Sequence, residues 1–513
     1  MRVTAETYLR FIIVSAITGV ASCAGAGIAV ASEEAASPRE EAVILTPKPP
    51  ATPRINGAKI FGVRPGHPFL FTIPATGQRP MEFSVDQLPE GLKVDPQTGQ
   101  ITGFIKDRGE YVVTFRAKNA LGQVDRPFKI VCGDTLALTP PMGWSNWYAD
   151  YGRVTDKVIR DAADAMVKNG MANVGYQYVT LDDCWSNAAK NPDPKRVGPP
   201  RDSQGNILTN QYFPDMKAMT DYVHARGLKA GIYSSPGPVT CQGFAASWKH
   251  EAQDAKQFAD WGFDLLMYDW CSYGGIHEKN IEYLKRPYKL MGGLLKQQDR
   301  DIHFNICQYG MGDVWKWGAE VGGQSWRTAF DMGYDLNRIA EVALKNASHR
   351  EYSKPGSWND PDNLIIGYYG KGPCRLTPTE QYAYMSYWCL MAAPLSYGGD
   401  MSRTDEFTLN VLCNPEVIEI DQDTLGECAR VVPLSEKTFL MVKRLEDGGT
   451  AVGLCNRGEG TQNVTAKWSD LGLTGKQTVR DLWRQKDLGG FDSQFSAPVG
   501  RHGVVLLRLR AGE

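Results

Sequence analysis

The 513-residue sequence predicts an α/β protein built around a TIM (β/α)8 barrel, with one β-sandwich before the barrel and an antiparallel β-sandwich after it. Strand-like and helix-like segments alternate from about 133 to 425, which is typical of a parallel barrel. Eight candidate strands fall in this region, and its length is that of an ordinary barrel. The segments on either side contain short apolar runs separated by turns, without long helical patterns.

The first 31 residues are predicted to be an export signal. Arg2 and Arg10 flank an n-region, and the apolar run 11–20 that follows is too short to span a bilayer as a mature helix. Ala29-Val30-Ala31 offers an ordinary signal-peptidase site, whereas the small residues before Cys23 fit a bacterial lipoprotein with a lipid anchor at that cysteine. Both interpretations predict a protein outside the cytoplasm, located in the periplasm, attached to the outer membrane, or secreted.

The next two segments precede the barrel. Residues 32–55 are rich in Glu, Ala and Pro and are predicted to be a linker. Residues 56–132 contain alternating runs at 69–73 and 111–115, separated by a turn at 95–99, and predict a small sandwich.

Residues 133–425 are predicted to form the barrel and 426–513 the last sandwich. The candidate strands are 141–147, 176–182, 229–235, 265–269, 302–307, 325–330, 362–366 and 394–398. The candidate helices are about 155–170, 214–226, 248–261, 279–297, 335–347 and 377–392. After 425 the pattern consists of short β runs such as 438–442 and 504–507.

The net charge, the aromatic content and the cysteine spacing limit the classes of function that are open to the protein. The net charge of −2 gives no bulk field that would favour nucleic acid or an anionic membrane. The 13 Trp and 22 Tyr suit stacking on sugar rings, although a large core uses such residues too. The 11 Cys contain no CxxC pair or other metal-ligand spacing.

Acidic residues gather at the predicted strand ends. Asp269 ends the buried run Leu265–Asp269, and a carboxylate at that end of a barrel strand is placed for catalysis. The other acidic residues at strand ends are Asp182, Asp183, Asp331, Asp360, Asp362 and Asp400, and Trp144, Trp185, Trp270 and Trp326 are interleaved with them. Each Asp alone is more often a helix cap, but agreement among so many strand ends favours glycoside hydrolysis, in which one carboxylate attacks and another donates a proton.

The motifs resemble those of glycoside hydrolase family 27, the α-galactosidase or melibiase family. They are TPPMGWSNWY, YVTLDDCW, GLKAGIYSSPG, HEAQDAKQFADWGFDLLMYDWC, SWRTAFDM, PGSWNDPDNL, APLSYGGD and VIEIDQDTLG, in that order between about 138 and 427. The segment LPEGLKVDPQTGQITGFIKDRGEYVVTFRAKNALG resembles the immunoglobulin-like module found beside many bacterial glycosidases.

The resemblance implies roles for individual residues. Asp269 would be the nucleophile and Asp331 the acid/base of a retaining reaction, for which the two carboxyls stand about 5–5.5 Å apart. Such a reaction needs no metal or organic cofactor, and we expect none. Cys241 and Cys271 match a pair of cysteines that form a disulfide beside the site. Asp182 and Asp183 would bind the 4- and 6-hydroxyls of the sugar, Arg327 the 2-hydroxyl side, and Trp144 the apolar face; Trp185 and Asp360 are expected in the same pocket.

Three positions depart from the family pattern. Met267 stands where the family usually has a Lys that reaches the 3- and 4-hydroxyls, so the pocket lacks a cation and a donor. Gln308 replaces a Glu and can still hydrogen-bond a hydroxyl without carrying charge. Asn363 stands where Met is usual.

The sequence therefore predicts an exported, retaining, exo-acting glycoside hydrolase that removes terminal α-linked galactose from oligo- or polysaccharides. Other family-27 specificities are alternatives: β-L-arabinopyranosidase, α-N-acetylgalactosaminidase or isomalto-dextranase. A non-catalytic carbohydrate-binding protein is a further alternative from a different class, and retention of both Asp269 and Asp331 argues against it. The sequence does not predict the oligomeric state.

Overall fold

A computed structural model describes residues 40–274, 280–332 and 336–512. The predicted signal peptide and Cys23 lie outside the described residues. Within these ranges, no helix is both long enough and apolar enough to cross a membrane.

The N-terminal sandwich contains a four-stranded sheet in the order β2-β9-β8-β5, a three-stranded sheet β3-β7-β6 and the pair β1-β4. Its strands are β1 Arg54–Ile55, β2 Ile60–Val63, β3 Phe69–Thr72, β4 Ala75–Thr76, β5 Glu82–Asp86, β6 Leu92–Val94, β7 Gln100–Gly103, β8 Gly109–Asn119 and β9 Gly122–Cys132. Phe71, Phe115 and Phe128 pack ring against ring in the core, at centroid distances of 4.2–5.9 Å. This is the Ig-like sandwich that the alternating pattern predicts.

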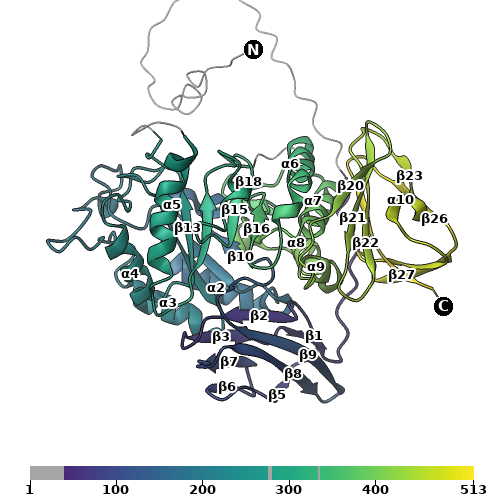
Figure 1. Cartoon of the computed structure of the whole chain (residues 1–513), viewed down its shortest axis with the longest axis horizontal. Coiled ribbons are helices and arrows are strands. Elements are labelled where there is room, and N and C mark those ends of the chain that lie inside the picture. Colours follow the sequence, from purple (N-terminus) through teal and green to yellow (C-terminus); the bar gives the residue numbers. More distant parts are fainter. Residues whose placement is uncertain (1–39, 275–279, 333–335, 513) are drawn as a thin grey trace, which may run out of the picture. The chain divides into compact units, whose positions relative to one another are not determined.

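The barrel is a single sheet of eight parallel strands in the order β16-β15-β14-β13-β12-β11-β10-β19. The strands are β10 Met142–Ser145, β11 Tyr178–Leu181, β12 Lys229–Ser234, β13 Leu265–Asp269, β14 His303–Cys307, β15 Ser325–Arg327, β16 Trp358–Asp360 and β19 Leu395–Tyr397. A parallel bridge between Leu364 and Tyr397 connects the chain after β16 to β19 and closes the ring. Figure 1 shows the strands surrounded by helices, as in a TIM barrel.

The prediction for the seventh strand was wrong. The segment 362–366 was expected to be that strand, but the strand is β16, which ends at Asp360. Asp362 has φ +98°, a left-handed conformation that breaks an extended run, and only Leu364 makes a bridge after it. The apolar run Leu364–Ile366 is buried, which explains why its pattern resembled a strand.

The helices follow the predicted pattern. They are α1 Trp147–Asp150, α2 Asp156–Lys168, α3 Met216–His224, α4 Glu251–Trp261, α5 Ile281–Leu295, α6 Leu336–Ser348, α7 Pro378–Met391, α8 Glu406–Leu412, α9 Pro415–Asp421 and α10 Trp468–Leu471. α7 begins with a capping box, in which the Thr377 side chain accepts from the Glu380 N–H and the Glu380 side chain accepts from the Thr377 N–H. It is buried along most of its length, between the barrel and the C-terminal strands.

The C-terminal strands form an antiparallel sandwich, as expected. A six-stranded sheet has the order β20-β21-β22-β27-β24-β25, and β23 pairs with β26. The bounds are β20 Arg430–Pro433, β21 Thr438–Arg444, β22 Thr450–Asn456, β23 Gln462–Lys467, β24 Gln477–Asp481, β25 Lys486–Phe491, β26 Gln494–Val499 and β27 Val504–Ala511; the short hairpin β17 Tyr368–Tyr369 and β18 Gly372–Pro373 belongs to the barrel loops.

Polar contacts join the three folded regions at α9. Glu416 of α9 accepts two hydrogen bonds from Arg480 of β24, at 2.7 and 2.8 Å. Arg54 of β1 lies 3.8 Å from the same carboxylate and pairs with Glu419 at 2.8 Å. We call this group of four side chains the α9 junction.

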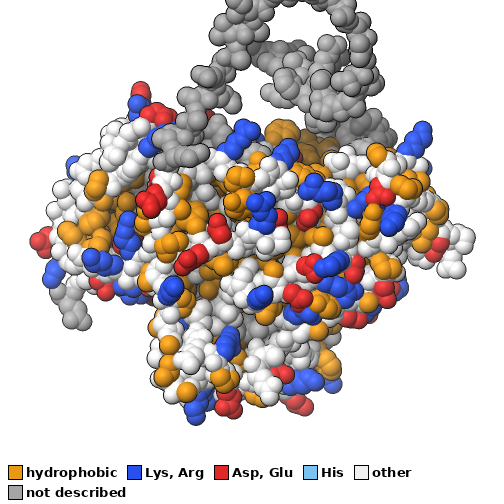
Figure 2. Space-filling view, turned by 180° about the vertical axis from the view of Figure 1, so that it is seen from behind, with side chains coloured by type: hydrophobic (Ala, Val, Ile, Leu, Met, Phe, Trp, Pro, Cys, Tyr) orange, Lys and Arg blue, Asp and Glu red, His pale blue; other side chains and the backbone are white. Residues whose placement is uncertain are grey.

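The described part of the predicted linker contacts the barrel. It has no regular secondary structure before β1, as a linker should, but Thr46 exchanges hydrogen bonds with Asn410 of α8. Figure 2 shows acidic and basic side chains interspersed over one face of the molecule, in keeping with the small net charge.

Candidate active site

The carboxyl ends of the barrel strands bring the predicted carboxylates to one end of the sheet. Asp269 is the last residue of β13, Asp360 is the last residue of β16, and Asp182 directly follows β11. Burial is the main cause of the raised pKa of Asp182, Asp183 and Asp269. The carboxylates also act on one another: the charge of Asp269 raises the pKa of Asp182 and of Asp183, and the charge of Asp331 raises the pKa of Asp269.

Asp269 is buried and held by two tyrosine hydroxyls. Tyr309 donates to Oδ1 at 2.6 Å, and Tyr233, from the neighbouring strand β12, donates to Oδ2 at 2.8 Å. Burial raises the pKa of the Asp269 carboxyl, and the two hydroxyls oppose that shift because they hydrogen-bond the ionised form. The carboxylate is therefore fixed in orientation and is stabilised as an anion by its own neighbours.

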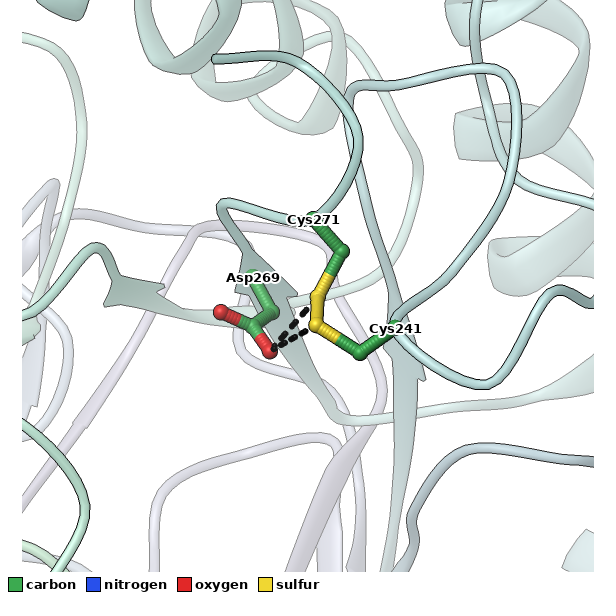
Figure 3. A group of neighbouring side chains, drawn as sticks. All are labelled: Cys241, Asp269 and Cys271. Carbon is green, nitrogen blue, oxygen red and sulfur yellow. Dashed lines mark hydrogen bonds between the residues drawn. A yellow bond between two sulfur atoms is a disulfide. The ribbon is translucent and has the colours of Figure 1, made fainter. Parts of the chain in front are cut away.

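A disulfide between Cys241 and Cys271 lies against this carboxylate (Figure 3), as the family resemblance implies. Its sulfur atoms are 3.7 and 3.2 Å from Oδ2 of Asp269. Cys241, Cys271 and Asp269 are close enough together to suggest a metal site, but sulfurs joined in a disulfide are not thiolate ligands. The bond ties the loop after β12 to the loop after β13.

Asp182 and Asp183 are both buried and hydrogen-bonded. Asp182 accepts from the Ser145 hydroxyl at 3.2 Å, and Asp183 accepts from the backbone N–H of Cys184 and of Gln242. Burial raises the pKa of Asp182 to about 7 and that of Asp183 to about 6. Carboxyl groups with such values can both donate to and accept from the hydroxyls of a bound sugar.

Arg327 connects the predicted acid/base to a buried carboxylate. Its Nη2 lies 3.2 Å from Asp331 Oδ1 and 3.1 Å from Asp362 Oδ2. Arg327 and Asp362 are buried, whereas the Asp331 side chain is 67% exposed. Asp331 thus stands at the outer edge of the site and Asp269 inside it, which is the arrangement expected when the proton donor faces the leaving group.

Several predicted sugar contacts line one small cavity inside the barrel, of about 50 Å³. Trp144, Met267, Arg327 and Asp360 are among its lining residues, together with Asn363. The Trp144 indole N–H donates to the Gly399 carbonyl at 2.7 Å, which fixes the ring. Asp360 accepts from the Asn305 amide at 2.7 Å and from the N–H of Asp362, so it organises the chain around the left-handed Asp362.

Trp185 and Gln308 are not placed as sugar contacts. The Trp185 ring packs edge-on against Phe258 and Trp261 of α4, and its N–H donates to the Tyr233 carbonyl, so it belongs to the layer between barrel and helix. The Gln308 amide is fully buried and its Nε2 donates to the Met311 carbonyl, while its Oε1 has no partner. The side chain of an aromatic residue that follows a strand can point toward the surrounding helices, away from the barrel axis. The pattern of apolar and polar residues in the sequence does not reveal that direction.

The two tyrosine donors to Asp269 were missed at the sequence level. Tyr233 lies in β12 beside Met267 in register, and Tyr309 comes two residues after β14. Both stand at the same strand ends as the carboxylates. A search of the strand ends for hydroxyl donors as well as acids would have found them.

A parallel barrel with one buried, hydrogen-bonded carboxylate and one exposed carboxylate on an arginine, beside further buried acids, is the site of a glycoside hydrolase. Comparison with known families agrees. The model for alpha galactosidase A matches residues 139–423, the alpha galactosidase C-terminal β-sandwich domain matches 436–509, and an Ig domain matches 52–133. The chain belongs to the α-galactosidase family.

The similarity to individual known proteins extends over most of the length of each of them. The α-galactosidase of Cyamopsis tetragonoloba is 39% identical over 379 residues, covering 73% of this chain and 87% of that protein, and α-galactosidase A of Cellvibrio japonicus is 35% identical over 401 residues, covering 73% and 93%. Among solved structures, a Bacteroides fragilis protein assigned to the α-galactosidases has a TM-score of 0.84 at 35% identity, covering 92% of this chain and 99% of that one. α-Galactosidase I of Mortierella vinacea has a TM-score of 0.68 at 30% identity, covering 74% and 99%.

Proposed function

We propose that the protein is an exo-acting, retaining α-galactosidase in which Asp269 is the nucleophile and Asp331 the acid/base. The observation that carries this assignment is the contrast between the two carboxylates. Asp269 is buried and held by two hydroxyls, whereas Asp331 is exposed and held on one side by Arg327. A nucleophile needs a fixed, ionised oxygen, and a group that both gives and takes a proton needs access to the leaving group and to water.

The reaction then has two steps. Asp269 attacks the anomeric carbon, the bond to the leaving-group oxygen breaks, and Asp331 gives its proton to that oxygen. In the second step Asp331, now ionised, takes a proton from water, the water oxygen attacks the anomeric carbon, and the ester to Asp269 breaks. The Tyr309 and Tyr233 hydroxyls keep the Asp269 oxygens oriented in both steps.

The glycone contacts proposed from the site are Asp182, Asp183, Arg327 and Trp144. The buried carboxyls of Asp182 and Asp183 can each bind hydroxyls on one side of the sugar, and the fixed Trp144 ring offers an apolar face. We leave Trp185 and Gln308 out of this set. The Trp185 N–H already donates to the Tyr233 carbonyl, and Gln308 is fully buried with its Nε2 bound to the Met311 carbonyl.

Hydrolysis of p-nitrophenyl α-galactoside tests the proposal, with the first-formed anomer followed by NMR. The sugar should appear first as the α anomer, because two inversions restore the starting configuration. Early appearance of the β anomer would rule out double displacement, and an absence of turnover on any glycoside would remove the enzymatic function.

Met267 favours one second candidate, a shifted glycone specificity. A thioether cannot donate to the hydroxyls that a lysine would bind, and Met267 lines the cavity beside Trp144 and Arg327. A β-L-arabinopyranosidase of Geobacillus stearothermophilus shares the fold, with a TM-score of 0.66 at 22% identity. Turnover of p-nitrophenyl β-L-arabinopyranoside in preference to the α-galactoside would support this candidate.

We also propose that the chain is exported and divided as its sequence suggests: signal 1–31, linker 32–55, Ig-like sandwich 56–132, barrel 133–425 and last sandwich 426–513. The last two residues of the linker form β1, which pairs with β4 of the sandwich. The Cys241–Cys271 disulfide supports export, because such bonds persist outside the cytoplasm. Mass spectrometry of the mature protein tests it: cleavage after Ala31 and a lipid on Cys23 are mutually exclusive results.

A further inference from the structure

At the edge of the site, the proposed mechanism uses the hydroxyl of Tyr309 but neither the ring of Tyr309 nor the ring that stacks on it. Phe330 and Tyr309 stack with their ring centroids 5.3 Å apart and an angle of 16° between the rings. Phe330 is 64% exposed, although large apolar side chains are usually buried. An exposed ring stacked on another offers one free apolar face to a ligand.

Each member of the pair is connected to one of the two catalytic carboxylates, Tyr309 by a hydrogen bond and Phe330 by the chain. The Tyr309 hydroxyl reaches inward to Asp269 at 2.6 Å, while its ring lies against Phe330, the residue directly before Asp331. Asp331, like Phe330, is exposed, whereas Asp269 is buried. A leaving group that Asp331 protonates would stand on this exposed side of the site, the side on which Phe330 is also exposed.

Both rings are held in place by the backbone around them. Tyr309 has φ +65°, a conformation that residues other than glycine rarely adopt. The Phe330 and Asp331 carbonyls both accept from Arg338 of α6, at 3.1 and 3.2 Å. Phe330 is thus held at two points: Arg338 of α6 binds its carbonyl, and Tyr309 packs against one face of its ring.

We propose that Phe330, supported by Tyr309, is the platform for the leaving group: its exposed face binds the apolar face of the pyranose, or of the aromatic group, attached to the cleaved bond. The inference rests on the proposed function, because it takes Asp331 as the acid/base. It adds a specificity-determining residue on the leaving-group side to a site whose other named residues face the glycone or the reacting atoms.

The test is Phe330→Ala measured on three substrates that share the galactosyl group: α-galactosyl fluoride, p-nitrophenyl α-galactoside and an α-1,6-linked galactosyl-glucose disaccharide. Fluoride has no ring to stack, so its kcat/KM should not change. The other two should each lose about three- to tenfold in kcat/KM, the range expected for one aromatic contact. Phe330→Trp keeps a ring and should restore both. Phe104→Ala removes a 47% exposed phenylalanine of the N-terminal sandwich and should change nothing.

The three substrates separate the platform from other roles. Nitrophenolate leaves without needing a proton, so a loss confined to the disaccharide would mean that Phe330 positions Asp331, and would overturn the platform. An equal loss on all three substrates, fluoride included, would overturn it too, as would no loss on any. If the wild type fails on every α-galactoside, the proposed specificity fails; the same comparison then uses the fluoride, p-nitrophenyl and disaccharide forms of the glycone that is hydrolysed.

Discussion

Replacement of Tyr309 by Phe isolates what one hydroxyl does for the nucleophile. The change keeps the ring and its stack on Phe330 and removes only the donor that lies 2.6 Å from Asp269 Oδ1. Burial already raises the pKa of Asp269, and this hydroxyl opposes the shift. Without it the pKa rises further. Because only the ionised carboxylate attacks, the acidic limb of the kcat/KM profile should move to higher pH.

The size of the effect follows from the type of bond. A short hydrogen bond to an ionised group contributes about 1.5–3 kcal/mol, and each 1.4 kcal/mol is about tenfold in rate. On the acidic side of the profile, kcat/KM should therefore fall by about ten- to a hundredfold, with a smaller loss at neutral pH where Asp269 remains ionised.

The assay is kcat/KM for p-nitrophenyl α-galactoside between about pH 4 and pH 8, a range chosen to bracket the titration of a raised carboxyl. Tyr222→Phe is the matched control, since it removes a tyrosine hydroxyl that donates to an exposed carboxylate, Asp164, at 2.8 Å. A Tyr309→Phe profile that superimposes on the wild type, or whose acidic limb moves to lower pH, would refute the role assigned to the hydroxyl.

Four further outcomes are expected. Asp269→Asn should lower kcat by several orders of magnitude while circular dichroism stays unchanged, because no neighbour can replace the nucleophile; substantial residual turnover would contradict the assignment. Asp331→Asn should damage disaccharides far more than p-nitrophenyl substrates, which need no proton at the first step; equal damage to both would undo the acid/base role. Met267→Lys should lower kcat/KM for the preferred substrate, because the half-buried position would hold an ammonium without a partner hydroxyl once the substrate excludes water; a gain confined to the α-galactoside, with no loss across a panel of p-nitrophenyl glycosides, would contradict a shifted specificity. Asp182 has a pKa of about 7, so the folded state holds a proton that the unfolded chain loses above about pH 4, and stability falls as pH rises through this window. Asp182→Asn should therefore gain stability over the wild type progressively between those values in urea melts, and a pH-independent difference would contradict the raised pKa.

The barrel and its carboxylates could be predicted because the signals are local. A parallel strand buried on both faces is a short apolar run, and an Asp at its end is visible in the sequence, as at Asp269. The seventh strand was misplaced because the left-handed backbone of Asp362 depends on hydrogen bonds to Asp360 and Met332 that no sequence pattern reports.

The partners of the nucleophile could not be predicted from its own strand. Tyr233 and Tyr309 come from β12 and from the loop after β14, so their hydroxyls meet Asp269 only when the sheet forms. The direction of the Trp185 ring could not be predicted from the sequence either. It comes two residues after Asp183, yet its ring packs against Phe258 and Trp261 of α4.

The α9 junction has a consequence for how the molecule unfolds. Glu416 and Glu419 of one short helix are bound by Arg54 from the first sandwich and Arg480 from the last. Removing either end of the chain therefore takes away one of the arginines that bind these carboxylates. The N-terminal sandwich should therefore contribute to the stability of the barrel. A chain shortened to the catalytic segment alone should melt at a lower temperature than the whole, and the intact protein should show one calorimetric transition in place of three.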